Sequence, residues 1–152
     1  MPTPREVFGT LAARISAGQW SEISGLYAED AVAEIPFALP VPERITGRAT
    51  LHERFCALAA GSLEMKAENI RVHETADPEV VVAEFDYRGR SLATGRSFAV
   101  SNIQVLRVRD GLIVETRDFH DHVAIAVATG HLPALAGAAG PGFDLDRTAL
   151  VG

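Results

Sequence analysis

Apolar and polar residues alternate most regularly between residues 96 and 122, in two apolar-rich runs on either side of Arg109-Asp110-Gly111. Alternation with a period of two predicts β-strands, and a short connection that contains glycine predicts an antiparallel hairpin. We therefore predict two long antiparallel strands here, with the rest of the chain packed around them.

The length of the loop decides which residues share a face of this hairpin. A three-residue loop, in which Gly111 adopts the left-handed conformation, keeps side chains of similar character on the same face of the hairpin. A two-residue Asp110-Gly111 loop is the more usual choice, but it pairs Asn102 with Phe119 and mixes the two faces, so we favour the longer loop. The pairs that it predicts are Val108 with Leu112, Leu106 with Val114, Gln104 with Thr116, Asn102 with Asp118, and Val100 with His120.

One face of the predicted hairpin is apolar near the turn and becomes polar farther out. Asn102, Gln104, Asp118 and His120 cluster there, beside Val100. An apolar surface with a few convergent polar groups is typical of a small-molecule pocket. We therefore predict a ligand site on this face, lined in part by Val100, Asn102 and Gln104.

The opposite face carries more apolar side chains than a strand exposed to water along its whole length usually has. Its charged residues can supply the polar rim of an interface. We predict a two-fold homodimer through this outer face. Its residues are Ile103, Val105, Arg107, Ile113, Glu115, Arg117 and Phe119.

Helical patterns precede the strands. Thr3-Pro4-Arg5-Glu6 is a capping box with Pro at the first helical position, and apolar residues follow at helical spacing up to Gly18. Ser21 can cap a short second helix. A third helix follows Thr46-Gly47-Arg48 and ends near Gly61.

Strand patterns occupy residues 31–35, 64–75 and 80–88, and a short helix follows the hairpin at residues 123–129. Three prolines break regular structure in residues 36–46, an apolar loop placed to cover a pocket mouth. Helices first and antiparallel strands afterwards predict an α+β fold. Three N-terminal helices would pack on one side of a strongly curved, mostly antiparallel sheet that encloses a hydrophobic pocket.

Length and charge narrow the class of protein. The 152 residues predict one domain at residues 1–130, followed by a partly irregular tail rich in Gly, Ala and Pro at residues 131–152. The net charge of −6 argues against a nucleic-acid partner. Cys56 is the single cysteine, so no internal disulfide forms, and no apolar run has the length of about 20 residues that crosses a bilayer. With no signal-peptide pattern at the N-terminus, we expect a cytoplasmic protein without a membrane partner.

Four segments resemble one known family: LYAEDAVAEIPF, ITGRATLHERF, TGRSF and RVRDGLIVETRDFHDH. They resemble the SnoaL-like branch of the nuclear-transport-factor-2-like (NTF2-like) superfamily. That branch is similar to ketosteroid isomerases, limonene-epoxide hydrolases, polyketide cyclases and the phenazine-biosynthesis A/B proteins. The resemblance covers about residues 5 to 130. It implies a cone-shaped NTF2-like fold and chemistry without a metal or cofactor.

Ketosteroid isomerase chemistry is not supported by the residues at the matching positions. The general-base Asp of those enzymes falls at Ile35, and their oxyanion-hole Tyr and Asp fall near Leu11 and Gln104. Polyketide cyclases of the family use one acid/base Asp. The resemblance gives that role to Asp118, with His120 beside it.

Epoxide hydrolases of the family use an Asp-Arg-Asp set, whose last Asp matches Asp118. The other two positions fall near Phe85 and Tyr87, or near Glu84 and Asp86, depending on where the gap is placed. Neither alignment supplies the Arg. The resemblance therefore favours cyclase-like chemistry over epoxide hydrolysis.

Asp118 and His120 are the predicted catalytic residues. Burial in an apolar cavity would raise the pKa of Asp118 toward the working pH, and the alternative is a structural carboxylate paired with an Arg or with Asn102. His120 would share a proton with Asp118 or orient the substrate. Asp118, His120 and His122 resemble a metal-binding set, but successive strand positions spread them over about 13 Å, so we predict no metal.

Aromatic residues complete the predicted substrate pocket: Trp20, Tyr27, Phe37, Phe55, Phe85 and Tyr87. Together with the resemblance, they predict a cofactor-independent enzyme that cyclises or isomerises a hydrophobic, polyketide-like substrate through Asp118. Two alternatives stay open. One is an epoxide hydrolase or epoxide-opening cyclase in the same pocket, and the other is a non-catalytic small-molecule-binding protein.

Overall fold

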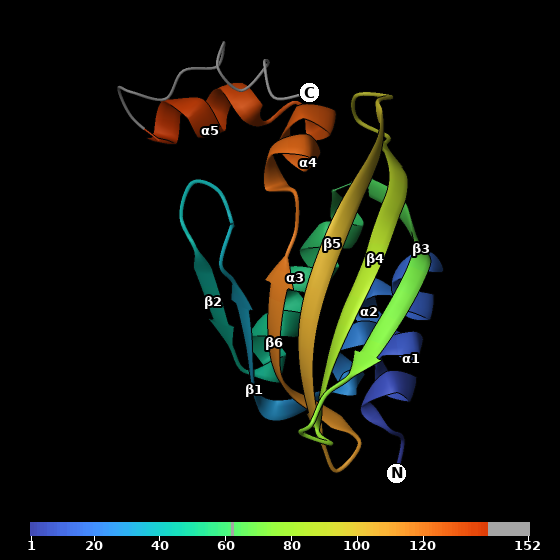
Figure 1. Cartoon of the computed structure of the whole chain (residues 1–152). Helices are drawn as coiled ribbons and strands as arrows, with labels where there is room; N and C mark the ends of the chain where they lie inside the picture. The colour runs from blue at the N-terminus through green and yellow to red at the C-terminus, as the bar shows by residue number, and fades with distance from the viewer. Residues whose placement is uncertain (62, 140–152) are drawn as a thin grey trace.

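A curved sheet of six strands forms the body of the protein, in a computed structural model that describes residues 1–61 and 63–139. The strand order is β2-β1-β6-β5-β4-β3, and β1 and β6 are parallel while the other neighbours are antiparallel (Figure 1). The mostly antiparallel sheet of the prediction is therefore confirmed. Its strands are β1 (Tyr27–Ile35), β2 (Glu43–Thr46), β3 (Leu63–Glu74), β4 (Val80–Ser91), β5 (Ser97–Arg109) and β6 (Leu112–Phe119).

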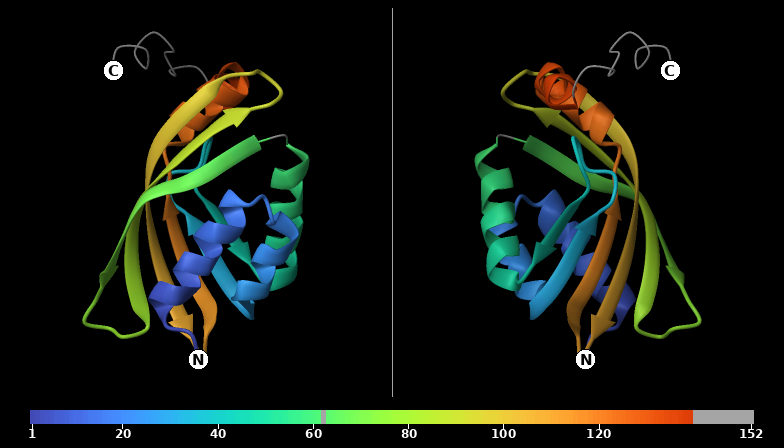
Figure 2. Two further views of the ribbon diagram at one scale, coloured as in Figure 1. Left: turned by 90° about the vertical axis from the view of Figure 1, so that its right-hand side faces the viewer. Right: turned by 90° about the vertical axis from the view of Figure 1, so that its left-hand side faces the viewer.

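Three N-terminal helices cover the concave side of the sheet, which confirms the α+β prediction (Figure 2). The first begins at the predicted capping box: the Thr3 hydroxyl accepts from the Glu6 N–H, and the Glu6 carboxylate accepts from the Thr3 N–H at 2.7 Å. Val7, Phe8 and Leu11 bury the apolar side of this helix in the main core. The helices are α1 (Pro4–Ser16), α2 (Trp20–Ile23), a 3₁₀ turn (Ser24–Leu26), α3 (Arg48–Ala60), α4 (His122–Thr129) and α5 (Leu132–Ala139).

The β5–β6 hairpin closes with a two-residue loop, so the predicted three-residue loop was wrong. Asp110 and Gly111 have φ angles of 51° and 76°, and Arg109 pairs with Leu112. Two positive φ angles give the turn the twist of the flanking strands, and Asp-Gly adopts them readily. Val114 then forms a bulge in β6, where the register shifts by one residue.

The bulge sets the register of the outer part of the hairpin. Gln104 pairs with Asp118, and the ladder places Asn102 opposite His120, so the predicted pairing of Asn102 with Asp118 was wrong by two residues. Two residues make one full period of a strand. All four polar side chains therefore lie on the inner face, as the sequence predicts.

Near the turn, the faces differ from the prediction. Ile113 pairs with Val108 and is fully buried in the main core, although the sequence placed it on the outer face. Leu112, predicted to face inward, is exposed. The physical reason is the bulge, because residues of β6 on its two sides have opposite parity.

Two segments that were predicted to be irregular, the loop at residues 36–46 and the tail at residues 131–152, contain regular structure in part. β2 lies within the predicted loop of residues 36–46 and pairs with β1. After β6, the Asp121 carboxylate caps α4 and Gly130 ends it in the left-handed conformation. α5 makes residues 132–139 of the predicted tail helical, and residues 140–152 lie outside the described residues. Within the described ranges, no helix has the length and apolar character needed to cross a bilayer.

Candidate functional site

Asp118 and Gln104 form the innermost polar pair of the β5–β6 hairpin. The Gln104 amide donates a 2.7 Å hydrogen bond from Nε2 to Asp118 Oδ1. Gln104 is buried, whereas the Asp118 side chain keeps some accessible surface although it lies deep in the protein. Neither of the two cavities described below is lined by Asp118.

The pKa of Asp118 is raised from its ordinary value of 3.8 to about 6. Burial is the main cause, because an apolar surrounding disfavours the charged carboxylate. The hydrogen bond from Gln104 lowers the pKa in part. The Thr116 hydroxyl lowers it too, although its Oγ makes no hydrogen bond of standard geometry to a described residue. A carboxyl group with this pKa accepts and returns protons near neutral pH.

Asn102 and His120 form a second polar pair, one strand period farther from the turn. His120 Nδ1 lies 2.9 Å from Asn102 Oδ1. The amide oxygen can only accept, so Nδ1 carries the proton and Nε2 keeps its lone pair. Asn102 is 3% exposed, and its Nδ2 has no hydrogen-bond partner among the described residues. The Asn102 amide therefore keeps a buried donor that no described residue satisfies.

His120 is held in its neutral form. Its pKa is lowered from 6.5 to about 4, chiefly by burial and secondarily by nearby His122. The two imidazole rings lie 5.7 Å apart. An imidazole with this pKa is an acceptor or positioning group at neutral pH and not a proton donor.

Two tyrosines, Tyr27 and Tyr87, lie near the polar pairs. The ring of Tyr87 lies 5.1 Å from Phe85 and 5.9 Å from His120, and the ring of Tyr27 lies 5.8 Å from Phe55. Burial raises the pKa of both tyrosines, and the nearby Asp118 charge raises them further. The structure thus brings the predicted Tyr27 of β1 and Tyr87 of β4 near the carboxyl group, and Phe55 and Phe85 pack against these two rings.

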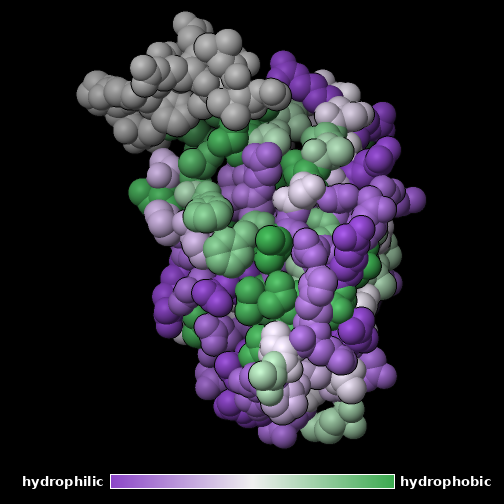
Figure 3. All heavy atoms as spheres, in the orientation of Figure 1, coloured by the Kyte–Doolittle hydropathy of each residue, from purple (hydrophilic) through white to green (hydrophobic). Residues whose placement is uncertain are grey.

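A cavity of about 490 Å³ lies near the end of β6 on the outer side of the sheet, where Glu84, Ser101, Ile103 and Phe119 line it and Asp118 does not. Four of the predicted residues line it: Phe37, Phe85, Asn102 and His120. Phe37 reaches it from the loop after β1, is 65% exposed and packs 5.4 Å from the ring of Phe119. Apolar residues gather on this face of the molecule between hydrophilic ones (Figure 3).

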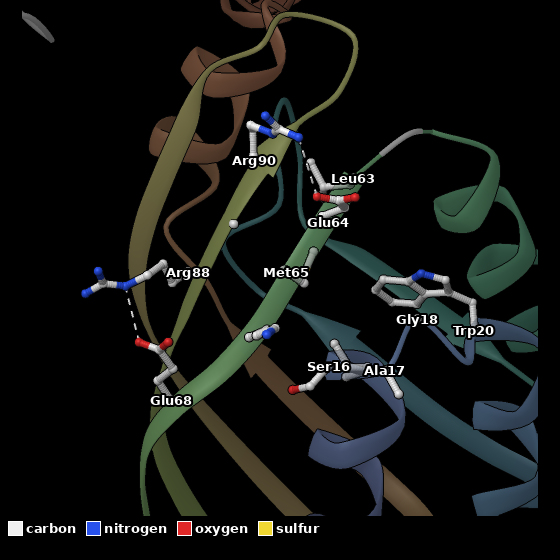
Figure 4. A pocket seen from close by; sticks show the side chains of 13 residues that line it. Ser16, Ala17, Gly18, Trp20, Leu63, Glu64, Met65, Glu68, Arg88 and Arg90 are labelled. Atoms are coloured by element: carbon white, nitrogen blue, oxygen red, sulfur yellow. Dashed lines mark ion pairs between the residues drawn. The ribbon is translucent and has the colours of Figure 1, made fainter.

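A second cavity of about 760 Å³ separates the α1–α2 turn from the edge strand β3. Trp20 and Met65 point into the gap from its two sides (Figure 4). Arg88 and Glu68 form an ion pair of 3.2 Å at the rim. Trp20, predicted as pocket lining, therefore lines this cavity and does not reach the one beside His120.

In the part of the chain that the structure describes, the residues considered for epoxide hydrolysis and for metal binding are not gathered around Asp118. Exposed Glu84 lies 2.6 Å from His73 Nε2, and half-buried Asp86 accepts hydrogen bonds from Asn69 and Ser101. Within residues 1–61 and 63–139, no three His, Cys, Asp or Glu side chains are arranged to hold a metal ion.

Two further residues lie near the site, although the sequence predicted Thr116 only as the partner of Gln104 and considered His122 only as a metal ligand. Thr116 is fully buried next to Asp118, and His122 Nε2 is buried without a partner among the residues described. Thr116 shares strand parity with Asp118, which places it on the inner face. The sequence placed His122 on the strand, but it begins α4, because β6 ends at Phe119.

Residues 9–116 match the model of a family described as SnoaL-like domain. An uncharacterised PhzA/B-like protein of Pseudomonas aeruginosa is 35% identical over 114 residues, which cover 73% of this chain and 79% of that protein. The crystal structure of a candidate isomerase from Bacillus subtilis has a TM-score of 0.79 at 28% identity, covering 84% of this chain and 93% of that one. A candidate polyketide cyclase from Pseudomonas putida shares the fold, with a TM-score of 0.69 at 21% identity over 84% of this chain and 98% of that one.

Proposed function

The chain belongs to the SnoaL-like family, and on that premise we propose that it is a cofactor-independent enzyme that cyclises or isomerises a hydrophobic, polyketide-like molecule. The names of the similar proteins, an isomerase and a polyketide cyclase, support this class of reaction. A fold hosts many chemistries, so the proposal rests on the site.

Asp118 carries the proposal. Its carboxyl group is buried near Tyr27 and Tyr87 and has a pKa of about 6, so it is ionised at neutral pH yet more basic than an ordinary aspartate. The Asp118 carboxylate removes a proton from the carbon next to a substrate carbonyl, and the electron pair moves onto the carbonyl oxygen as an enolate. Gln104 holds the carboxylate through its 2.7 Å hydrogen bond.

The second half of the reaction returns the proton. In a cyclisation, the enolate carbon attacks another carbonyl carbon of the same molecule, and Asp118 protonates the alkoxide that forms. In an isomerisation, Asp118 returns the proton to a different carbon. The Asn102 Nδ2 group is a neutral donor for the enolate oxygen, and such a preorganised donor stabilises developing charge.

Asp118→Asn tests the proposal, because it keeps the size of the side chain and removes the proton carrier. We would screen thermal shifts against aromatic polyketides, terpenoids, steroids and epoxides, then analyse products of each ligand that binds. Asp118→Asn should bind the same ligand and lose about 10²- to 10⁴-fold in turnover. Glu115→Gln, which removes an exposed carboxylate from the same hairpin, is the control and should keep full activity.

The other outcomes decide between the remaining functions. Conversion by Asp118→Asn at the wild-type rate would overturn the assignment of Asp118. A ligand that binds wild type and variant but is converted by neither would make the protein a small-molecule binder. Conversion of epoxides alone would replace cyclisation with epoxide opening in the same site.

A further inference from the structure

The cavity of about 760 Å³ between the α1–α2 turn and strand β3 is separate from the site proposed around Asp118, which does not line it. Its inner wall is apolar, because Trp20 and Met65 point into the gap from its two sides, next to Ile15 and Leu63 (Figure 4). A concave space of this size with an apolar wall and a few polar groups is typical of small-molecule binding.

Trp20 provides an unpaired hydrogen-bond donor in this cavity. It is 7% exposed, and its indole N–H donates to none of the residues that the structure describes. A buried indole usually finds a hydrogen-bond partner. Since Trp20 lines the cavity, a bound molecule with an acceptor oxygen can supply that partner.

Strand β3 turns its outer hydrogen-bonding edge toward the same cavity. The Ala67 N–H donates to Ser16 Oγ at 2.9 Å, so this edge faces the end of α1. Backbone groups of an antiparallel strand alternate between its two edges, and Met65 lies two residues before Ala67 with no shift of register between them. The Met65 N–H and C=O groups therefore point toward the gap, on the side of β3 that ends the sheet.

The rim of the cavity has one cation more than it has carboxylates. Both carboxylates have an Arg partner, since Glu68 lies 3.2 Å from Arg88 and Glu64 lies 3.9 Å from Arg90. The remaining cation, Lys66, forms no ion pair among residues 1–61 and 63–139. The chain as a whole carries a net charge of −6, so this local excess of positive charge favours an anionic ligand here.

We propose that this cavity binds an apolar molecule with a single carboxylate group. The apolar body lies between Trp20 and Met65, and the carboxylate accepts hydrogen bonds from the Lys66 ammonium and from the N–H groups of Met65 and Trp20. A cationic ligand would need the carbonyl groups at the end of α1, but that of Ile15 already accepts from the Gly18 N–H at 3.0 Å. The proposal does not depend on the function proposed for Asp118.

The test compares three probes with the same alkyl chain and different head groups: octanoate, 1-octanol and octylammonium. Trp20 is the only tryptophan of the chain, so its fluorescence reports on this cavity, and none of the three probes absorbs where tryptophan does. Wild type should bind octanoate about threefold to tenfold more tightly than 1-octanol, because the carboxylate gains a charge pair and charged hydrogen bonds. Octylammonium should bind most weakly. Isothermal titration calorimetry measures the same affinities without the tryptophan signal.

Variants locate the head group. Lys66→Met should reduce the preference for octanoate over 1-octanol to below about twofold, because the charge pair is gone. Arg71→Met is the matched control, since it removes a positive charge from the same strand outside this cavity, and it should keep the wild-type ratio. Trp20→Phe, measured by calorimetry, removes the indole N–H and should weaken octanoate more than 1-octanol.

Each ratio is measured within one variant, so a partly unfolded fraction affects both ligands equally. Octanoate binding seen by calorimetry without a change in Trp20 fluorescence would place the ligand elsewhere and overturn the proposal. Equal affinities of wild type for octanoate and 1-octanol would also overturn it, as would tighter binding of octylammonium or a wild-type ratio in Lys66→Met. Absence of octanoate binding at millimolar concentration would reject the site altogether.

Discussion

Gln104 Nε2 donates to Asp118 Oδ1 at 2.7 Å across the β5–β6 ladder, one strand period from the hydrogen bond between His120 and Asn102. The hairpin thus holds an acid whose pKa is raised and a base whose pKa is lowered, side by side. Burial causes both shifts, because it disfavours the charged form of either group. The two residues should therefore affect stability with opposite dependence on pH.

Asp118→Asn should raise the stability of the protein at neutral and higher pH. The folded pKa of about 6 lies above the usual 3.8, so protonation of Asp118 stabilises the native state at low pH, and this contribution is lost as pH rises through 6. The variant does not titrate there. Its free energy of unfolding, measured with urea, should exceed that of wild type by up to about 3 kcal/mol at about pH 8, and the difference should shrink toward about pH 4.

Stability of Glu115→Gln should follow the wild-type curve across the same range, since its carboxylate is exposed. A large loss of stability in Asp118→Asn at every pH would contradict the prediction. Asp118 would then be a structural partner in a buried network and not an acid kept for chemistry.

His120→Gln should show the opposite behaviour. The folded pKa of about 4 lies below the usual 6.5, so neutral His120 contributes stability above pH 6.5 that is lost as pH falls through 4. Replacing the imidazole removes that loss. His122, whose pKa is also lowered by burial, still titrates, so it leaves a smaller dependence of stability on pH in the same direction. Relative to wild type, the variant should gain up to about 3 kcal/mol between about pH 6.5 and pH 4. Parallel urea curves for the two proteins over this range would show that His120 does not titrate as the structure indicates.

The inner face of the hairpin was predictable because strand parity survives an error of two residues. The sequence placed Asn102 and Gln104 with Asp118 and His120, and the structure does the same with different partners. Gly111 predicts a turn, but local propensity does not predict the bulge at Val114. Burying Ile113 against the main core depends on the helices that pack there, so the bulge follows from tertiary contacts.

Helices were predictable for a different reason. The capping box at Thr3 and Glu6 is local chemistry, and it begins α1 where the sequence predicts. The position of Phe37 could not be predicted from local chemistry. Its place beside Phe119 depends on how the loop after β1 folds over the end of β6, a contact between residues far apart in the chain.

Two glycines should respond oppositely to substitution by alanine. Gly111 has a φ angle of 76°, and a Cβ there would lie 2.9 Å from Pro2 Cδ, so Gly111→Ala should cost about 1–2 kcal/mol. Gly9 lies exposed in α1 with no atom within 4 Å of an added Cβ. Gly9→Ala should therefore stabilise the protein by about 0.5–1 kcal/mol. Urea denaturation at one pH measures both, and a gain of stability in Gly111→Ala would contradict the two-residue turn.

We also propose that the outer face of the sheet forms a two-fold homodimer. Ile103 is 44% exposed there and pairs with Phe119, which packs against Phe37, and all three line the 490 Å³ cavity. Exposed aromatic and aliphatic side chains within a charged rim are typical of an interface core. Ile113, which is buried, does not take part, in contrast to the residues predicted from the sequence.

Ile103→Lys should convert the dimer to a monomer, because a two-fold axis places the substituted residue in the interface twice and buries two like charges. Leu92→Lys is the matched control, since Leu92 is 48% exposed but lies at the β4–β5 turn, outside this cavity. Sedimentation velocity at micromolar concentration should give a dimer for wild type and Leu92→Lys and a monomer for Ile103→Lys. A wild-type monomer would reject the proposal, whereas a dimer that survives Ile103→Lys would move the interface to another face.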